Sequence, residues 1–78
     1  MRQFLDGVQL ELTAENLKKH LGKRVRYFLE SDMKWYGLVV RSGIIARIYY
    51  SQVALDEAGE NFIWIRDIRE MVLLESKL

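Results

Sequence analysis

Alternating apolar and polar positions predict a chain of short strands, with one short helix near its start. Val8, Leu10 and Leu12 alternate with polar residues, which is the pattern of a strand with one buried face. Later apolar runs are rich in aromatic and β-branched residues and are separated by polar or glycine-containing turns. The predicted strands cover residues 24–29, 35–40, 44–55, 61–65 and 71–75, with turns at 30–32, Ser42-Gly43 and 56–60 and a bend near Ser51-Gln52.

Residues 13–21 carry the signals of a short helix. Thr13 is a suitable N-cap, and Glu15 lies in the first turn, where negative charge favours the helix dipole. Lys18, Lys19 and His20 fall in the last turn, where positive charge is favoured. Gly22 follows as a residue that can end the helix in a left-handed conformation.

The C-terminal segment allows two interpretations. Ile65, Ile68, Met71 and Val72 have helical spacing, and Arg66 could pair with Glu70. We prefer a short turn at 66–68 followed by a strand over 71–75, because four strands need a partner to cover their edges.

These elements predict a mostly β fold, namely a small barrel of about five strands with one short N-terminal helix, formed by residues 1–78 as a single domain. Gly37 falls between apolar residues of the predicted strand 35–40, where we expect a bend or a close strand crossing.

Two short motifs are Trp35-Tyr36-Gly37-Leu38-Val39 and Ile63-Trp64-Ile65-Arg66-Asp67-Ile68. The first resembles the second strand, and the second resembles the fourth strand, of bacterial Sm-like proteins, the group that includes Hfq and the Rof-type inhibitors of the terminator Rho. The resemblance, from Gly22 to Glu75, implies an Sm-like or SH3-like barrel. Asp67 stands where the family has glycine, and the loop after Val40 lacks the Asp and Asn of RNA-binding Sm rings.

Composition excludes several classes of function. The chain has no cysteine and one histidine, so a zinc site of Cys and His ligands cannot form, and we expect no metal or cofactor. His20 lies among lysines, a setting that suits neither a catalytic triad nor a metal ligand. We therefore expect no enzymatic activity and no small-molecule substrate. No apolar run reaches the length of a membrane span, and we expect a cytoplasmic protein that does not bind membranes.

Basic residues concentrate between Lys18 and Arg26, although the net charge is only +1. The helix end and the first strand after it could form one positive surface that contacts phosphates. Alternatively, the lysines complement the helix dipole, and Arg24 and Arg26 form the solvent face of a half-buried strand.

Apolar residues, among them six aromatic ones, occur at consecutive positions in 35–36, 49–50 and 62–65. Consecutive residues of a strand point to opposite faces, so part of this apolar surface lies outside the barrel. Phe4 and Leu5 can cover some of it, and a second subunit, another protein or a ligand would cover the rest, including Trp64. Exposed aromatics beside Lys34, Arg41 and Arg47 suit a protein interface or a stacking platform for single-stranded nucleic acid.

The sequence therefore predicts a non-enzymatic protein–protein interaction or regulatory module that self-associates. The alternative is a domain that binds RNA or single-stranded DNA. Near-neutral charge and the missing Sm loop residues favour the former, and the basic stretch favours the latter. The candidate binding residues are Lys18, Lys19, Lys23, Arg24, Arg26, Lys34, Trp35, Tyr36, Arg41, Arg47, Tyr49, Tyr50 and Arg66.

Overall fold

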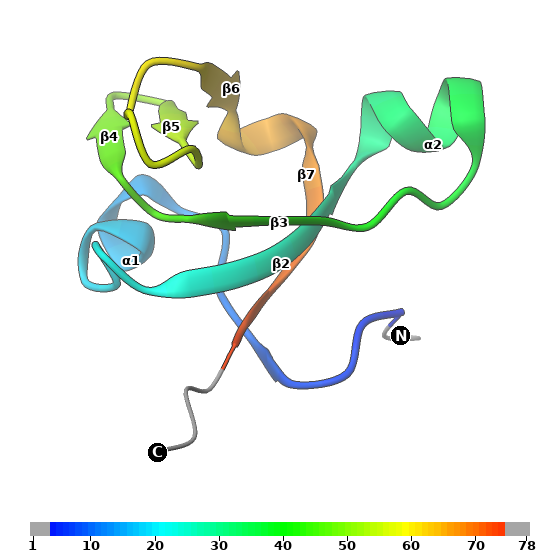
Figure 1. Ribbon diagram of the computed structural model, residues 1–78, viewed down its shortest axis with the longest axis horizontal. Coiled ribbons are helices and arrows are strands. Elements are labelled where there is room, and N and C mark those ends of the chain that lie inside the picture. Colours follow the sequence, from blue (N-terminus) through cyan, green and yellow to red (C-terminus); the bar gives the residue numbers. More distant parts are fainter. Residues whose placement is uncertain (1–3, 75–78) are drawn as a thin grey trace.

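The fold is mostly β, as the sequence predicts, and consists of two antiparallel sheets with two helices at their ends (Figure 1). The computed structural model describes residues 4–74. Its elements are β1 (Val8–Gln9), α1 (Ala14–Lys18), β2 (Arg24–Leu29), α2 (Glu30–Tyr36), β3 (Arg41–Ile44), β4 (Arg47–Tyr49), β5 (Gln52–Ala54), β6 (Phe62–Trp64), the 3-10 turn η1 (Ile65–Asp67) and β7 (Ile68–Leu73).

The two sheets are joined along one side and do not close into the predicted barrel. One sheet has the strand order β1-β7-β2-β3, and the other has the order β4-β5-β6. The amide of Ile44 donates to the carbonyl of Leu55, and that of Ala46 to the carbonyl of Ala54, at 3.0 and 2.9 Å. These bonds continue the pairing across the bend between β3 and β4. The chain enters β7 through η1, and among the described residues β6 pairs only with β5.

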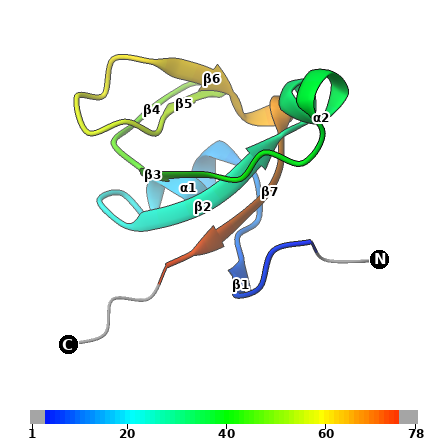
Figure 2. The same ribbon diagram turned by 45° about the vertical axis from the view of Figure 1, so that its right-hand side comes forward.

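The main hydrophobic core lies between the two sheets. Val25 and Tyr27 of β2 and Met71 of β7 face Val53 of β5, and all four side chains are buried. Leu17 of α1 closes one end of this core and is fully buried. Figure 2 shows the three-stranded sheet above the four-stranded sheet, so that each sheet has an outer face pointing away from the other.

The N-terminal helix begins where the sequence predicts and ends sooner. The amide of Asn16 donates to Oγ1 of Thr13 at 3.1 Å, which confirms Thr13 as the N-cap. The helix stops at Lys18, and residues 19–22 form turns that end at Gly22, with φ +85°. The cap and the acidic first turn are therefore confirmed, but the predicted end is wrong: Lys18 is the basic residue of the last turn, Lys19 and His20 follow the helix, and Gly22 ends the turns after it rather than the helix itself.

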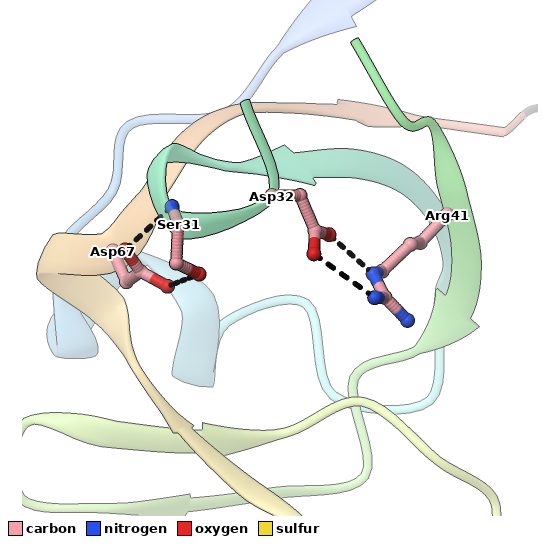
Figure 3. A network of polar contacts seen from close by, with 4 residues as sticks. All are labelled: Ser31, Asp32, Arg41 and Asp67. Atoms are coloured by element: carbon pink, nitrogen blue, oxygen red, sulfur yellow. Dashed lines mark hydrogen bonds and ion pairs between the residues drawn. The ribbon is translucent and has the colours of Figure 1, made fainter. Parts of the chain in front are cut away.

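The prediction of a second strand over residues 35–40 is wrong. Residues 30–36 form α2, and the predicted turn at 30–32 is the first turn of that helix. Figure 3 shows the two contacts that hold it. Asp67 accepts hydrogen bonds from the amide and the hydroxyl of Ser31, at 3.2 and 2.7 Å. Asp32 accepts from Nε and Nη2 of Arg41, at 2.6 and 3.1 Å.

The N-terminal segment covers part of the outer face of the four-stranded sheet, and not the aromatic residues at 35–36, 49–50 and 62–65 that it was predicted to cover. Leu5 packs with Phe28 and Val72, and the ring of Phe4 stands edge-on to that of Phe28 at 5.7 Å. One carboxylate holds the segment. Glu70 Oε1 accepts from the amides of Phe4 and Leu5, at 3.1 and 3.0 Å, and from Nε2 of Gln9 at 3.0 Å.

Gly43, and not Gly37, is the glycine of a close approach between strands. Gly37 follows α2 with φ +83°, and a Cβ there would meet nothing within 4 Å. Gly43 lies inside β3, where a turn was predicted, and a Cβ there would stand 2.3 Å from the Leu55 carbonyl oxygen. Only glycine lets β3 approach Leu55 closely enough for the bond from Ile44.

We expect Gly43→Ala to lower the free energy of unfolding by about 2–3 kcal/mol, because backbone must move to admit the methyl group. Ser42→Ala, at the exposed neighbouring position, should change it by less than about 0.5 kcal/mol. Urea denaturation of both variants measures the difference. Equal midpoints would show that the approach of β3 to Leu55 does not need glycine.

Glu70 makes stability depend on pH in a defined direction. Burial raises the pKa of this carboxylate, but hydrogen bonds from Phe4, Leu5 and Gln9 lower it by more, so its pKa in the folded protein lies below its ordinary value. A lowered folded pKa stabilises the protein above the unfolded value of about 4.3, and this stabilisation is lost as the pH falls through the folded value.

We therefore expect Glu70→Gln to cost about 1–2 kcal/mol at neutral pH, since its amide group offers one acceptor oxygen in place of two. The difference between the variant and the wild type should shrink on acidification below about pH 4. Urea titrations across the acidic range measure it. A difference that stays constant with pH would show that the charge of Glu70 does not stabilise the N-terminal segment.

Candidate binding surface

Strand pairing sorts the residues of the three-stranded sheet onto two faces. Ile48, Val53 and Ile63 stand opposite one another in neighbouring strands and pack in or against the core. Cross-strand partners share a face, and consecutive residues of a strand alternate between faces. The outer face is therefore formed by two rows of partners: Tyr49, Gln52 and Trp64 in one, and Arg47, Ala54 and Phe62 in the other.

Aromatic rings dominate this outer face. The ring of Tyr49 stands 6.2 Å from that of Phe62 and 4.7 Å from that of Tyr50, in edge-to-face geometry in both cases. Tyr49 is 60% exposed and Trp64 is 44% exposed. Ala54 of this face is fully buried, and Gly59 of the loop between β5 and β6 packs on the side chain of Arg47, so the exposed part of the face is the side that carries Tyr49 and Trp64. The structure therefore leaves a rigid aromatic surface in water, which is the surface that the sequence predicts for Tyr49 and Tyr50.

Tyr50 stands at the tip of the hairpin between β4 and β5. Tyr49 pairs with Gln52, so the connection consists of Tyr50 and Ser51. Tyr50 has φ +56°, the one positive value among the described residues other than glycine, and its side chain is 79% exposed. The carbonyl of Ser51 accepts a hydrogen bond from the amide of Ile65 at 2.9 Å, which holds the hairpin against η1.

Two arginines border the aromatic surface. The guanidinium carbon of Arg66 lies 4.7 Å from the centroid of the Trp64 ring, in a cation–π contact. The side chain of Arg47 passes Gly59, where a Cβ would stand 3.4 Å from Cδ of Arg47. Neither arginine forms an ion pair with another residue between 4 and 74. These two arginines therefore carry positive charge that no direct ion pair neutralises, although the acidic loop 56–60 lies beside Arg47.

The acidic loop beside Arg47 is organised around Asp56. Its carboxylate accepts hydrogen bonds from the amides of Asn61 and Glu60, at 3.1 and 3.3 Å. These bonds, the one from Asn61 first, hold the pKa of Asp56 below its ordinary value. The loop is the predicted turn at 56–60, and the carboxylate of Asp56 closes it.

The basic stretch belongs to the other side of the molecule. Arg24 and Arg26 are exposed on the outer face of β2, while the residues that alternate with them, Val25 and Tyr27, face the core. The three-stranded sheet lies across that core, so the two arginines point away from the aromatic surface. Lys18 and Lys19 are exposed at the end of α1, and Lys23 is exposed in the turn before β2.

The remaining predicted residues lie on α2 and β3. Trp35 and Tyr36 are exposed, but α2 is a helix at the end of the molecule opposite α1 and β4, so the pair is not part of the strand surface that was predicted (Figure 1). Lys34 is exposed on the same helix. Arg41 is bound to Asp32, and this bond lowers the pKa of Asp32 and raises that of Arg41.

The candidate residues named from sequence omit Gln52, Phe62 and Trp64. The sequence did indicate surplus apolar surface at 62–65 and placed Trp64 in it. Phe62 and Trp64 share one face of any strand because they are two residues apart, and this spacing was a usable signal. No signal in the sequence identified Gln52, since only its pairing with Tyr49 and Trp64 places it on this face.

Comparisons of the chain with protein-family models, with curated proteins and with solved structures found no match. The resemblance to Sm-like proteins therefore stays a prediction. Within residues 4–74, no helix is both long enough and apolar enough to span a membrane.

The assignment of faces predicts that truncating a core residue costs more stability than truncating a larger residue of the outer face. Val53→Ala should lower the free energy of unfolding by about 2 kcal/mol, because the side chain is fully buried in the core. Trp64→Ala should cost less than about 1 kcal/mol despite the larger truncation, because the indole packs against an outer face. Urea denaturation compares the two. A larger loss for Trp64→Ala would place Trp64 in the core and remove the proposed surface.

Proposed function

We propose that the chain is a non-enzymatic protein-binding module, and that its docking surface is the outer face of β4, β5 and β6. One observation carries this proposal: Tyr49 and Trp64 project from the exposed side of the same sheet face, with Arg66 stacked on Trp64. Tyrosine, tryptophan and arginine are the residues that contribute most to protein interfaces. The hydrogen-bonded strands beneath them fix their positions, so little conformational entropy is lost on binding.

The distribution of charge favours protein over nucleic acid. A surface for single-stranded nucleic acid combines stacking aromatics with cations that follow the phosphate backbone. Here Arg24 and Arg26 lie on the sheet opposite the aromatic surface. Arg47 and Arg66 alone border the rings, beside the acidic loop 56–60. One strand of nucleic acid would therefore not reach both the aromatic surface and the basic stretch without passing around the molecule.

The partner is either a second copy of the chain or a different protein. In either case the module acts by binding to that partner and not by catalysing a reaction. The proposal places it in the cytoplasm, because the 78 residues include no cysteine that a disulfide would need.

The test compares two double variants in protein capture from a nuclease-treated lysate. We expect the wild type to retain at least one partner, and Tyr49→Ser with Trp64→Ser to lose it, because the anchors of the interface are removed. Trp35→Ser with Tyr36→Ser is the matched control, since it removes a tryptophan and a tyrosine that are even more exposed, from α2. Sedimentation equilibrium of the same proteins distinguishes self-association from a different partner.

Two outcomes would contradict the proposal. One is retention of every captured protein by the Tyr49 and Trp64 double variant, with the wild type and that variant sedimenting alike. The other is loss of all binding after nuclease treatment, together with binding of single-stranded DNA that weakens steeply as salt increases.

A further inference from the structure

A second exposed apolar region lies at the end of the molecule that carries α2 (Figures 1 and 2). Trp35 and Tyr36 of α2 are 75% and 77% exposed. Leu38 and Val40, in the connection from α2 to β3, are 50% and 44% exposed. Val40 lines a hollow together with Phe4, so the N-terminal segment extends the region. We call these five residues the α2 end, and so much exposed apolar surface indicates a binding partner.

Basic side chains without ion pairs border the α2 end. Arg26 lines the same hollow as Val40. Arg24 points outward on the same face of β2, and Lys34 is exposed on α2. None of these three cations forms an ion pair with another residue between 4 and 74. They include part of the basic stretch, to which the protein-binding surface gives no role.

Few free carboxylates oppose this positive charge. Glu70 is buried, and it accepts hydrogen bonds from amides of the N-terminal segment. Asp6 is the one acidic residue that lines the hollow beside Arg26. The acidic residues of α2 are each bound to an arginine, in the pairs Glu30–Arg69 and Asp32–Arg41. The unpaired charge around the apolar side chains is therefore mainly positive.

We infer that the α2 end attaches the protein to the surface of a lipid bilayer that contains anionic lipids. Tryptophan and tyrosine concentrate at the boundary between headgroups and acyl chains, because each joins an apolar ring to a polar N–H or O–H group. The aliphatic side chains of Leu38 and Val40 would enter this boundary with them. The unpaired cations would meet the anionic headgroups, which adds electrostatic attraction to the burial of apolar area.

The composition of the α2 end favours a bilayer over a macromolecular partner. A surface for single-stranded nucleic acid is a groove in which successive bases stack on rings, and the aliphatic Leu38 and Val40 offer no ring. Trp35 and Tyr36 stand largely in water. A protein would need complementary pockets to receive such protruding side chains, whereas the boundary region of a bilayer receives them without a matching shape.

Attachment at a bilayer surface requires no membrane span. The expectation from sequence that the chain does not bind membranes rested on the absence of a long apolar run, which bears only on spanning. Anionic lipids are concentrated in the cytoplasmic leaflet, so the inference agrees with the proposed location in the cytoplasm. It adds a second site to the proposed function and does not depend on the first.

The experiment measures co-sedimentation of the protein with vesicles of phosphatidylcholine alone or of phosphatidylcholine mixed with phosphatidylserine. We expect binding to the mixed vesicles that weakens several-fold as salt increases, and binding to phosphatidylcholine that is about tenfold weaker or less. The chain has two tryptophans, so the Trp64→Phe protein reports on Trp35 alone. Its emission should move to shorter wavelengths on the mixed vesicles and be quenched by lipids with brominated acyl chains.

Aromatic variants locate the apolar contact. We expect Trp35→Ser with Tyr36→Ser to weaken binding to the mixed vesicles about tenfold or more, because both rings leave the boundary region. Tyr49→Ser with Tyr50→Ser is the matched control. It removes two exposed rings from β4 and its hairpin, at the opposite end of the molecule, and should bind as the wild type does. Urea denaturation checks that each variant is folded.

Charge variants test the basic border. We expect Arg26→Gln with Lys34→Gln to weaken binding to the mixed vesicles about tenfold or more. Lys18→Gln with Arg47→Gln removes the same charge from α1 and β4, at the opposite end, and should have little effect. Asp6→Asn should strengthen binding, because it removes the free carboxylate beside Arg26. A variant that only damages the fold would weaken binding instead.

Three results would overturn the inference: no binding to the mixed vesicles at low salt, equal losses for the two aromatic variants, or binding without quenching of Trp35 by brominated lipid. Equal binding to both kinds of vesicle would overturn the role of the basic residues. If Trp35→Ser with Tyr36→Ser loses proteins captured from the lysate but binds vesicles normally, the occupant of the α2 end is a protein. The vesicles contain no protein, so failure here leaves the proposed function of the aromatic surface standing.

Discussion

The close approach of β3 to Leu55 is the constraint on which the other features depend. Gly43 allows it, because a Cβ would stand 2.3 Å from the Leu55 carbonyl oxygen. The bonds from Ile44 and Ala46 then carry the pairing around the bend and fix where β4 begins. The position of β4 decides which of its residues face the core. With Ile48 inward, Tyr49 faces outward, and the register with β5 and β6 places Trp64 beside the same outer surface.

Local signals predicted the elements whose determinants lie close together in sequence. Thr13 and Glu15 specified where α1 begins, although not where it ends, and the alternation of Val25 with its charged neighbours specified β2. The failure at 30–40 has a physical cause. Trp35 and Tyr36 favour strands by intrinsic propensity. The helix α2 forms instead because Ser31 donates hydrogen bonds to Asp67 and Asp32 accepts one from Arg41. Both partners come later in the chain than the helix.

The candidate surface was partly predictable for a related reason. Surplus aromatic residues at 49–50 and 62–65 showed that some apolar surface lies outside the core, which follows from alternation alone. Which aromatics share a face follows from register, and register depends on the length of the hairpin at Tyr50 and on the bend after Gly43. The basic stretch was visible as a cluster in sequence, but its separation from the aromatics depends on how the two sheets stack.

Tyr50 lowers the stability of the hairpin turn while it adds an exposed ring to the aromatic surface. A residue with a β-carbon loses roughly 1–2 kcal/mol in the left-handed region, and two-residue hairpins are normally formed by Gly, Asn or Asp. A tyrosine with φ +56° at this tip is therefore less stable than the residues that the turn prefers. Selection of variants for thermal stability alone would replace it and remove an exposed ring from the edge of the surface. Thermostable versions of this domain, chosen without regard to binding, would thus be expected to have a smaller aromatic face.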